Sequence, residues 1–308
     1  MSEPPILDEA AVRSRLDCDA LIPSMERALA AFSRGDVEQP VRTVLDVSGR
    51  GVFAVMPAHV RGDELLGAKL VSVFPGNAGR GKPTHQATIV LIDPETGETL
   101  AVMDGRYITE VRTAAVSAVS VRHLARADAR KLGIIGSGVQ GRSHVEMLRR
   151  VREWSSILAW SPDRERLRRF AEECGATPAS SAEEVARGSD VLVTATSARE
   201  PFLRSEWVRD GAHVIAVGAC LPGQSEVGPA LVARSRLFVD SEAAAMRESG
   251  DVLGGIRAGG AIAGELGQVI GGAIRGREFP GQVTLFKSLG LAVEDIVAAG
   301  LVYAAVRK

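Results

Sequence analysis

One glycine-rich segment, residues 136–141, constrains the fold of this chain more than any other feature. It reads Gly-Ser-Gly-Val-Gln-Gly, follows an apolar run at 132–135 and precedes a helical pattern at 142–150. At such a strand-to-helix turn the first glycine turns the chain, the second lets the backbone approach a pyrophosphate, and the third allows close helix packing. The segment therefore predicts a dinucleotide site rather than a glycine-rich turn without a ligand. The residues assigned to it here are Gly136, Ser137, Gly138, Val139 and Gln140.

From residue 132 onward, short apolar runs alternate with helical stretches. After the first run, strand-like segments fall at 157–160, 191–196, 214–218, 237–240 and 283–286. This alternation is typical of βαβ units that build a mainly parallel sheet. We therefore predict the α/β fold class, with a Rossmann-type dinucleotide-binding domain.

The chain before residue 122 has a different pattern, in which short Val-rich runs follow one another across turn-forming residues. The strand-like runs are 42–47, 51–60, 65–74, 85–93 and 99–104. The first two and the last two are joined by short polar turns, which predicts antiparallel hairpins. Apolar residues at helical spacing predict a helix over 17–33. Together these segments predict a small α+β domain.

The end of the chain completes the predicted domain organisation. An Ala/Val/Leu-rich helix is expected at 288–306, beyond the last strand, and we expect it to pack back on the first part of the chain. The prediction is a substrate-binding and dimerisation domain of residues 1–122 plus 288–308. The Rossmann domain, residues 123–287, is inserted into it.

Charge and cysteine content exclude several function classes. The 308 residues include 37 Lys+Arg and 38 Asp+Glu, so no basic surface for nucleic acid or an anionic membrane is predicted. No apolar run of 18 residues and no signal-peptide pattern occurs, and the three cysteines lack metal-ligand spacing. We expect a cytoplasmic protein without a metal site or disulfide framework.

The end of the second βαβ strand bears on the choice of coenzyme. After Trp160, Ser161 can donate a hydrogen bond, and Arg164 with Arg166 can offer charge-assisted bonds to a 2′-phosphate, which favours NADPH. Asp163 argues the other way, because an acidic side chain here binds the free ribose hydroxyl of NADH. Both arginines could also be the solvated face of a helix. We predict NADPH, with NADH as the alternative.

Three cations occur where a solvated charge is not expected. Arg42 begins a strand, Lys69 lies in an apolar run, and Arg112 is expected to open an Ala/Val-rich helix at 113–125. A buried cation needs a partner, which a substrate carboxylate would supply. The alternative is that each cation pairs with an acid nearby in sequence: Asp46, Glu64 or Glu110. His85, in the segment Pro-Thr-His-Gln at 83–86, is a further candidate because its imidazole follows a threonine hydroxyl. A lone histidine is, however, more often structural than catalytic.

A set of short motifs spans nearly the whole chain. They include QPVRT at 39–43, KLV at 69–71, PTHQAT at 83–88, the glycine motif, ESGDV at 248–252 and FKSLG at 286–290. In this order they resemble the ornithine cyclodeaminase/mu-crystallin family, and its ketimine reductase branch looks closest.

The resemblance implies a homodimer and assigns roles to residues. Residues matching Arg42, Lys69 and Arg112 would hold the substrate carboxylate. Those facing the nicotinamide or the substrate would be Thr84, His85 and Thr113. Ser288 would lie near the nicotinamide ring, and the cofactor set is completed by Thr194, Thr196 and Val217 at strand ends. The mu-crystallin branch has an arginine where this chain has Pro162, so the NADPH assignment depends on Ser161 and Arg164.

Cys220 marks a departure from the cyclodeaminases, which have an aspartate at the corresponding loop position for work on the substrate amine. A thiol is a weak donor and mostly neutral at pH 7. A reductase that accepts a preformed cyclic imine does not need that carboxylate. We therefore expect hydride transfer from NAD(P)H to small cyclic ketimine carboxylates, 1-pyrroline-2-carboxylate and 1-piperideine-2-carboxylate, yielding proline and pipecolate.

Two alternatives stay open. One is ornithine cyclodeaminase or alanine dehydrogenase activity, and the other is a non-catalytic protein that binds NADPH and an amino-acid-like ligand. The partners expected are the small imino acid and a second copy of the chain, not nucleic acid or a membrane.

Overall fold

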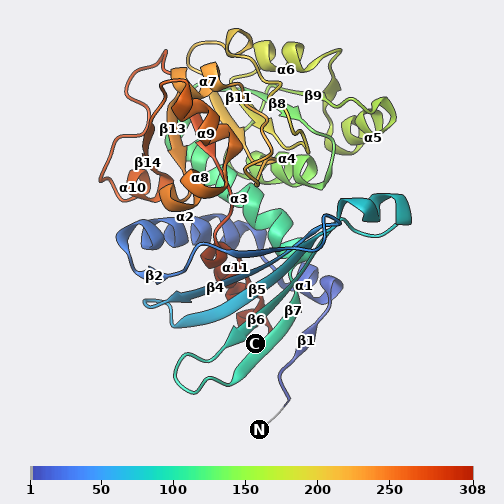
Figure 1. The fold of residues 1–308 in the computed structure, drawn as a ribbon, viewed down its shortest axis with the longest axis vertical. Coiled ribbons are helices and arrows are strands. Elements are labelled where there is room, and N and C mark those ends of the chain that lie inside the picture. Colours follow the sequence, from blue (N-terminus) through green and yellow to red (C-terminus); the bar gives the residue numbers. More distant parts are fainter. Residues whose placement is uncertain (1–2, 308) are drawn as a thin grey trace. The chain divides into compact units, whose positions relative to one another are not determined.

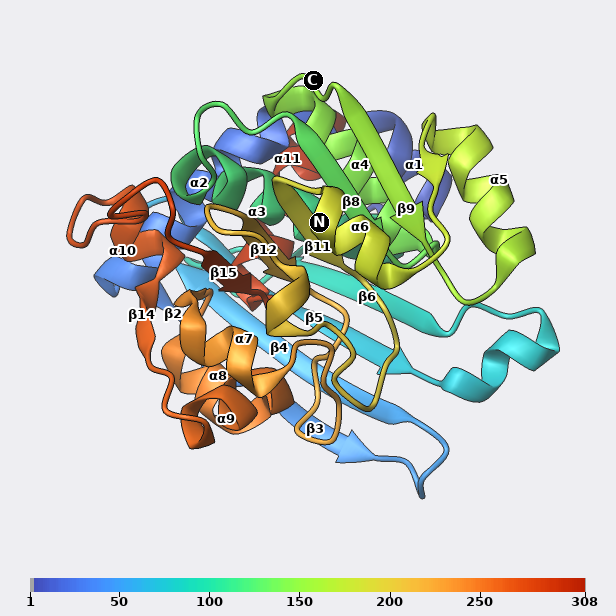
Figure 2. The same ribbon diagram turned by 90° about the horizontal axis from the view of Figure 1, so that it is seen from above.

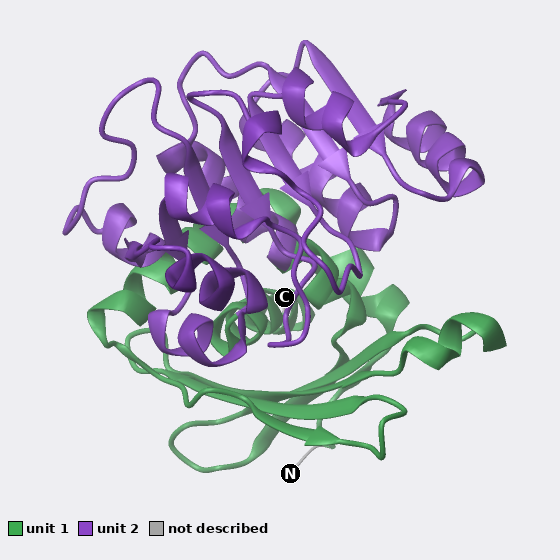
Figure 3. Cartoon of the chain, turned by 45° about the horizontal axis from the view of Figure 1, so that its top comes forward, with its two compact units in different colours: residues 1–112, 291–308 green, residues 113–290 purple. Residues whose placement is uncertain are grey.

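A computed structural model describes residues 3–307, and the chain divides into two compact units (Figure 3). Unit 1 comprises Met1–Arg112 and Leu291–Lys308, and unit 2 comprises Thr113–Gly290. Residues 1–2 and 308, which the predicted domain ranges include, lie outside the described residues.

Unit 1 contains a seven-stranded sheet. Its strand order is β1 (Ile6–Leu7), β7 (Thr99–Asp104), β6 (His85–Ile92), β5 (Leu65–Val73), β4 (Val52–Val60) and β2 (Val37–Glu38), and β3 (Thr43–Asp46) also pairs with β4. The β3–β4 and β6–β7 pairs are antiparallel, which confirms both predicted hairpins. Side chains alternate between buried and more exposed along β4, as expected for a sheet with one covered face.

The helices of unit 1 are α1 (Glu9–Arg15), α2 (Cys18–Arg34), α11 (Ala292–Val306) and the 3₁₀ turn η1 (Pro75–Arg80). The α2 helix is capped by the Asp17 side chain and ends at Gly35, which has φ +82°. In Figure 1, α11 lies along the sheet beside α2, and it packs against α2, β4, β5 and β6. Residues 292–299 of α11 are all buried, so this helix is the centre of the unit 1 core.

Unit 2 contains an eight-stranded sheet in which every strand pair is parallel. Its order is β10 (Thr177–Pro178), β9 (Ser156–Trp160), β8 (Lys131–Ile135), β11 (Val191–Thr194), β12 (His213–Ala216), β15 (Thr284–Lys287), β13 (Arg236–Val239) and β14 (Ile262–Glu265). This sheet confirms the predicted α/β class, and Figure 2 shows β9, β8 and β11 side by side. From β8, the strands β9 and β10 are added on one side of the sheet and β11 and β12 on the other. The switch point lies between β8 and β11, where open sheets of this kind bind ligands.

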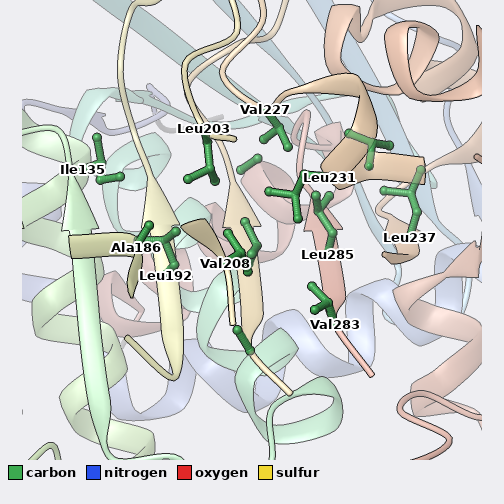
Figure 4. Packing of buried hydrophobic residues seen from close by; sticks show 14 of the residues in the cluster. Ile135, Ala186, Leu192, Leu203, Val208, Val227, Leu231, Leu237, Val283 and Leu285 are labelled. Carbon is green, nitrogen blue, oxygen red and sulfur yellow. The ribbon is translucent and has the colours of Figure 1, made fainter. Parts of the chain in front are cut away.

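The remaining helices are α3 (Arg106–Leu124), α4 (Val139–Val151), α5 (Arg164–Cys174), α6 (Ala182–Gly188), α7 (Pro229–Arg234), α8 (Glu242–Glu248), α9 (Gly250–Arg257) and α10 (Leu266–Ile270), with the 3₁₀ turn η2 (Ser205–Trp207). A buried apolar cluster fills the space between the sheet of unit 2 and the helices α6, α7, α8 and α9. Figure 4 shows Leu192, Leu231 and Leu285 among its members, with Val227 from the loop before α7. None of the helices in residues 3–307 is long and apolar enough to cross a membrane.

Three predicted helix starts are wrong. The α4 helix begins at Val139 and not at 142, because Gly138, inside the glycine motif, is already its N-cap. The α3 helix begins at Arg106, so Arg112 lies in its interior instead of opening it, because the Asp104 carboxylate accepts a hydrogen bond from the Arg106 amide. The α11 helix begins at Ala292 and not at 288, because residues 289 and 290 donate their amides to the Asp240 carboxylate, and Gly290 has φ +82°. The start of α3 is therefore set by a side chain two residues before Arg106, and the start of α11 by a side chain about 50 residues earlier in the chain.

Candidate active site

The glycine motif forms a tight loop between β8 and α4. Gly136 has φ +119°, and a Cβ there would lie 2.4 Å from the Ala195 carbonyl oxygen. A Cβ on Gly141 would lie 2.3 Å from the carbonyl oxygen of Gly136. Both glycines are therefore required by the protein's own packing.

Gly138 is different, because a Cβ there would meet no described protein atom within 4 Å. Gly138 is the N-cap of α4 and has no side chain that could accept a hydrogen bond from the first turn. The first N–H groups of α4 are therefore left without a side-chain cap, next to the open space at Gly138. The Gln140 Oε1 atom, two residues on, is buried without a hydrogen-bond partner in the described residues. An open cradle at a helix N-terminus with an unmet polar atom fits the pyrophosphate of a dinucleotide.

Arg142 supports this loop and was missed by the sequence reasoning. Its Nη1 donates to the Ser137 carbonyl at 2.6 Å, and its Nε donates to Glu173 at 2.5 Å. Glu173 lies on α5, so Arg142 ties the glycine loop to the next helix. Its position one residue after the last glycine was the only available signal.

The end of β9 presents the residues predicted to select the coenzyme. Ser161 is buried, while Arg164 is exposed at the first position of α5. Asp163 caps α5 by accepting the Arg166 amide at 3.0 Å, and its carboxylate also pairs with the Arg166 guanidinium at 3.3 Å. Within residues 3–307, Arg164 makes no ion pair. Asp163 and Arg166 therefore pair with each other, whereas the Arg164 guanidinium is in no ion pair with a described residue.

The strand-end residues Thr194 and Thr196 both donate their hydroxyl groups to Glu226, at 3.0 and 2.7 Å. Glu226 also accepts the amides of Thr196 and Gly218, at 2.7 and 2.8 Å. Burial raises the pKa of this carboxyl group. Glu226, which the sequence reasoning missed, thus fastens the loop after β12, which includes Val217 and Cys220, to the end of β11.

A buried ion pair lies beside this loop. Lys287, the last residue of β15, places its Nζ 3.0 Å from Asp251 Oδ2, and both side chains are fully buried. The other oxygen of Asp251 accepts the amides of Glu226 and Val227, at 2.7 and 2.9 Å. Burial lowers the pKa of Lys287, but Asp251 and its acidic neighbours outweigh that effect and raise it.

Ser288 follows directly, buried, and donates its hydroxyl to Asp240 at 3.3 Å. Cys220 is half-buried, with its Sγ 3.4 Å from the Val217 carbonyl oxygen. The carboxyl edge of the unit 2 sheet therefore brings together the glycine loop, Thr194, Thr196, Val217 and Ser288.

Unit 1 brings together the predicted cations, but their partners differ from those considered. Lys69 Nζ lies 2.5 Å from Asp295 Oδ2. Arg112 pairs with Asp295 Oδ1 through Nε at 2.9 Å and with Glu294 Oε2 through Nη1 at 2.5 Å. The partners are thus acids of α11, about 180 residues away from Arg112, and not Asp46, Glu64 or Glu110. The signal for them was a Glu-Asp pair within an otherwise apolar helix.

Electrostatics link the other residues of this cluster. Burial lowers the pKa of Lys69 to about 8, with Arg112 and Arg42 acting in the same direction and Asp295 opposing them. Burial, Lys69 and Arg112 lower the pKa of His85 to about 4, so its imidazole is neutral near pH 7. Arg42, which is half-buried, therefore lies close enough to act on Lys69.

The two remaining predicted residues lie on different units. Thr84 is exposed and immediately precedes His85 on unit 1. Thr113 is half-buried and is the first residue of unit 2, directly after Arg112 on α3. The α3 helix thus carries one member of the cation cluster and continues into the nucleotide-binding unit.

Comparisons with known proteins agree along the whole chain. The model of the ornithine cyclodeaminase/mu-crystallin family matches residues 2–308. The ketimine reductase mu-crystallin of Rattus norvegicus is 44% identical over 289 residues, which is 92% of this chain and 91% of that protein.

Two solved structures are also similar. The Delta(1)-pyrroline-2-carboxylate reductase of Thermococcus litoralis, in complex with NADH and L-proline, has a TM-score of 0.94 and 34% identity, and 98% of this chain and 97% of that chain are covered. An archaeal alanine dehydrogenase dimer with bound NAD has a TM-score of 0.94 and 33% identity, with 99% and 97% covered.

Proposed function

The chain belongs to the ornithine cyclodeaminase/mu-crystallin family, and from this premise we propose that it is an NAD(P)H-dependent reductase of small cyclic ketimine carboxylates. The substrates are 1-pyrroline-2-carboxylate and 1-piperideine-2-carboxylate, and the products are proline and pipecolate. The observation that carries the proposal is the buried pair Lys69 and Arg112, clamped by acids of α11, in a chain whose other unit presents a dinucleotide loop.

The residues of unit 1 bind and orient the substrate. Arg42, Lys69 and Arg112 hold its carboxylate, and this fixed orientation lowers the barrier by converting a bimolecular encounter into a positioned one. When bound, NAD(P)H supplies the hydride that reduces the imine carbon. Protonated imines accept hydride more readily, and near pH 7 Lys69 Nζ holds a proton whereas the His85 imidazole does not.

The residues of unit 2 hold the coenzyme. The glycine loop and the N-terminus of α4 bind the pyrophosphate, Ser161 and Arg164 bind the adenosine ribose and its phosphate, and the strand-end residues Thr194, Thr196 and Val217 line the same edge. Ser288 is assigned to the nicotinamide ring. Thr113 and, on unit 1, Thr84 are assigned to the nicotinamide or the substrate.

Cys220 supports reduction over cyclodeamination. A cyclodeaminase must take a proton from an ammonium group, and a half-buried thiol whose Sγ contacts the Val217 carbonyl oxygen is poorly suited to that step. A preformed cyclic imine already has its C=N bond, so its reduction requires no such group.

The test is the absorbance of reduced coenzyme at 340 nm with purified protein. Oxidation of NADPH or NADH is expected with either cyclic imine. Reduction of NAD with alanine at a higher kcat/KM would instead indicate the alanine dehydrogenase alternative. Release of ammonia from ornithine with catalytic NAD, without net change in absorbance at 340 nm, would indicate the cyclodeaminase alternative, because that reaction regenerates its NAD. Tight NADPH binding without turnover of any imine would indicate a non-catalytic binding protein.

We further propose NADPH as the preferred coenzyme, because Asp163 is occupied by Arg166 and the helix cap while Arg164 is not paired. Similar solved structures contain NADH or NAD, so NADH is the alternative coenzyme. The ratio of the two kcat/KM values decides between them.

We also propose a homodimer in which residues 1–122 plus 288–308 form the substrate-binding and dimerisation domain and residues 123–287 the Rossmann domain. The related alanine dehydrogenase is a dimer, and Val44, Leu45, Leu70 and Val73 on β3 and β5 are exposed apolar residues of unit 1. Light scattering should give twice the chain mass of 32.5 kDa. The three free cysteines suit a reducing, cytoplasmic setting.

A further inference from the structure

The first turn of α11 contains two adjacent acids on a helix that is otherwise apolar. Glu294 and Asp295 follow Ala292 and Val293 and precede Ile296, and all five side chains are buried. Burying a carboxylate is costly unless cations or hydrogen-bond donors compensate for the lost water. The two acids must therefore be compensated by the groups they contact.

Asp295 contacts two cations, one with each oxygen. Oδ2 lies 2.5 Å from Lys69 Nζ, and Oδ1 lies 2.9 Å from Arg112 Nε. Because both oxygens are bonded to one carbon, the two cations are held a few ångströms apart. Glu294, the preceding residue, pairs with Arg112 at 2.5 Å and makes no ion pair with Lys69 in residues 3–307.

We propose that Asp295 is a positioning residue, which holds the Lys69 ammonium and the Arg112 guanidinium at the spacing that binds the two oxygens of one substrate carboxylate. The inference rests on the proposed function, because Lys69 and Arg112 are the proposed carboxylate ligands. Through the charge of Asp295, the helix α11 would then contribute to the substrate site.

The charged groups around Lys69 explain why a bridging acid is needed. Arg112 on α3 and Arg42 before β3 both repel its ammonium, and His85 on β6 is neutral at pH 7. Asp295 on α11 is the group that favours the protonated lysine. Without its charge the ammonium would lose its proton at lower pH and would no longer bind a carboxylate.

Two neighbouring isosteric variants separate this role from general helix packing. Asp295→Asn removes the charge that contacts Lys69, whereas Glu294→Gln removes an equally buried charge that contacts Arg112. For the wild type, kcat/KM for 1-pyrroline-2-carboxylate should fall above about pH 8, as Lys69 loses its proton. In Asp295→Asn this fall should begin about 1 to 3 pH units lower, and in Glu294→Gln it should stay in place. The substrate's own ionisation is common to all three proteins and cancels.

A third variant separates charge from geometry. Asp295→Glu keeps the charge, so the pKa of Lys69 should stay near 8, but the longer side chain moves the two cations. We expect its KM for the imine to rise about tenfold or more, as for the loss of one charge-assisted hydrogen bond. An unchanged KM in a folded Asp295→Glu protein would overturn the positioning role.

Lysine NMR gives a readout that does not need turnover. The chain has only five lysines, Lys69, Lys82, Lys131, Lys287 and Lys308, so side-chain labelled lysine gives few signals. The Lys69 signal should titrate near pH 8, move to lower pH in Asp295→Asn and stay in Glu294→Gln. Equal shifts in both variants, or no shift in a folded Asp295→Asn protein, would overturn the inference.

Folding is verified by circular dichroism and by NADPH affinity, which depends on unit 2. If Asp295→Asn does not fold, the Asp295→Glu measurements decide. If the wild type turns over no imine, the proposed function fails, and a shifted Lys69 titration would still show that Asp295 controls this cation.

Discussion

Arg112 has two roles that substitution can separate, because it pairs with two buried acids and is a proposed ligand of the substrate. Arg112→Ala leaves Glu294 and Asp295 with one cation fewer and should cost about 3 to 5 kcal/mol of unfolding free energy. Arg112→Lys keeps a charge but loses the two-pronged guanidinium, so we expect an imine KM about 10 to 100 times higher in a protein that still folds. NADPH affinity, measured by fluorescence titration, should change much less. Equal losses for imine and NADPH would mean that Arg112 has a general structural role.

Arg164 is the residue on which the NADPH preference depends. Removing its guanidinium in Arg164→Ala should lower kcat/KM for NADPH about tenfold or more and leave that for NADH nearly unchanged, because only NADPH has the 2′-phosphate. Arg168→Ala is the matched control, since Arg168 lies on the same helix but pairs with Glu172 at 2.6 Å. Equal effects of the two variants, or a wild-type preference for NADH, would contradict this assignment.

At the scale of elements, the loop after β12 is held by Glu226, which accepts four hydrogen bonds. The donors are the hydroxyl of Thr194 at the end of β11, the amide and hydroxyl of Thr196 just after that strand, and the amide of Gly218 in the loop. Glu226→Gln replaces one acceptor oxygen with an amide group that faces donors. We expect a loss of about 1 to 3 kcal/mol in unfolding free energy, in urea titrations, together with weaker NADPH binding. The exposed Glu206→Gln should change neither quantity. A folded Glu226→Gln protein with unchanged NADPH affinity would show that the loop does not contribute to the coenzyme site.

Local patterns predicted most of the elements, because hydrophobic periodicity and glycine spacing act over a few residues. The strand at β7 and the parallel sheet of unit 2 agree with expectation. The two-residue strands β1, β2 and β10 were not predicted, since two residues show no periodicity. The strand β14 was missed because its sequence, Ile-Ala-Gly-Glu, contains residues that are depleted in strands. The predicted start of α11 was wrong because a side chain about 50 residues earlier sets it, whereas the start of α3 depends on Asp104, a local signal that the periodicity of the helix did not reveal.

For the candidate site as well, features that depend on neighbouring residues could be predicted from the sequence, whereas contacts between distant residues could not. The glycine loop, the end of β9 and the three cations could be singled out from sequence because each carries an unusual residue in an apolar setting. Their partners could not, since Asp295 and Glu226 meet Lys69 and Thr194 only after the chain has folded. For this reason the sequence suggested a substrate carboxylate as the missing counter-charge, whereas the structure supplies two acids of its own.

At the scale of the whole molecule, a net charge of −1 conceals titratable groups whose burial links stability to pH. In unit 2, His144 and His213 are fully buried and bonded to Ser117 and Ser120 on α3, at 2.9 and 3.0 Å. Burial lowers the pKa of His144 to about 4 and that of His213 to about 3. Both are therefore neutral in the folded protein at pH 7.

These two histidines should make unit 2 less stable in mild acid. Their unfolded pKa is 6.5, so as the pH falls below 6.5 the unfolded chain takes up protons that the folded protein does not. Stability should decline down to about pH 4 for His144 and pH 3 for His213, by about 2 kcal/mol for each between pH 7 and pH 5. All three tryptophans, Trp154, Trp160 and Trp207, lie in unit 2, so their fluorescence in urea follows this unit.

Substitution of the two histidines isolates their share from that of other acid-sensitive groups. His144→Asn should reduce the slope of unfolding free energy against pH between pH 6 and pH 5 by about 1.4 kcal/mol per pH unit, the value for one proton, and His144→Asn with His213→Asn by about twice that. Burial also lowers the pKa of His85, on unit 1, and its contribution persists in both variants. If the doubly substituted protein kept the wild-type slope, the buried histidines would not account for acid sensitivity, and protonation of the ion pairs around Asp190 and Asp295 would have to explain it instead.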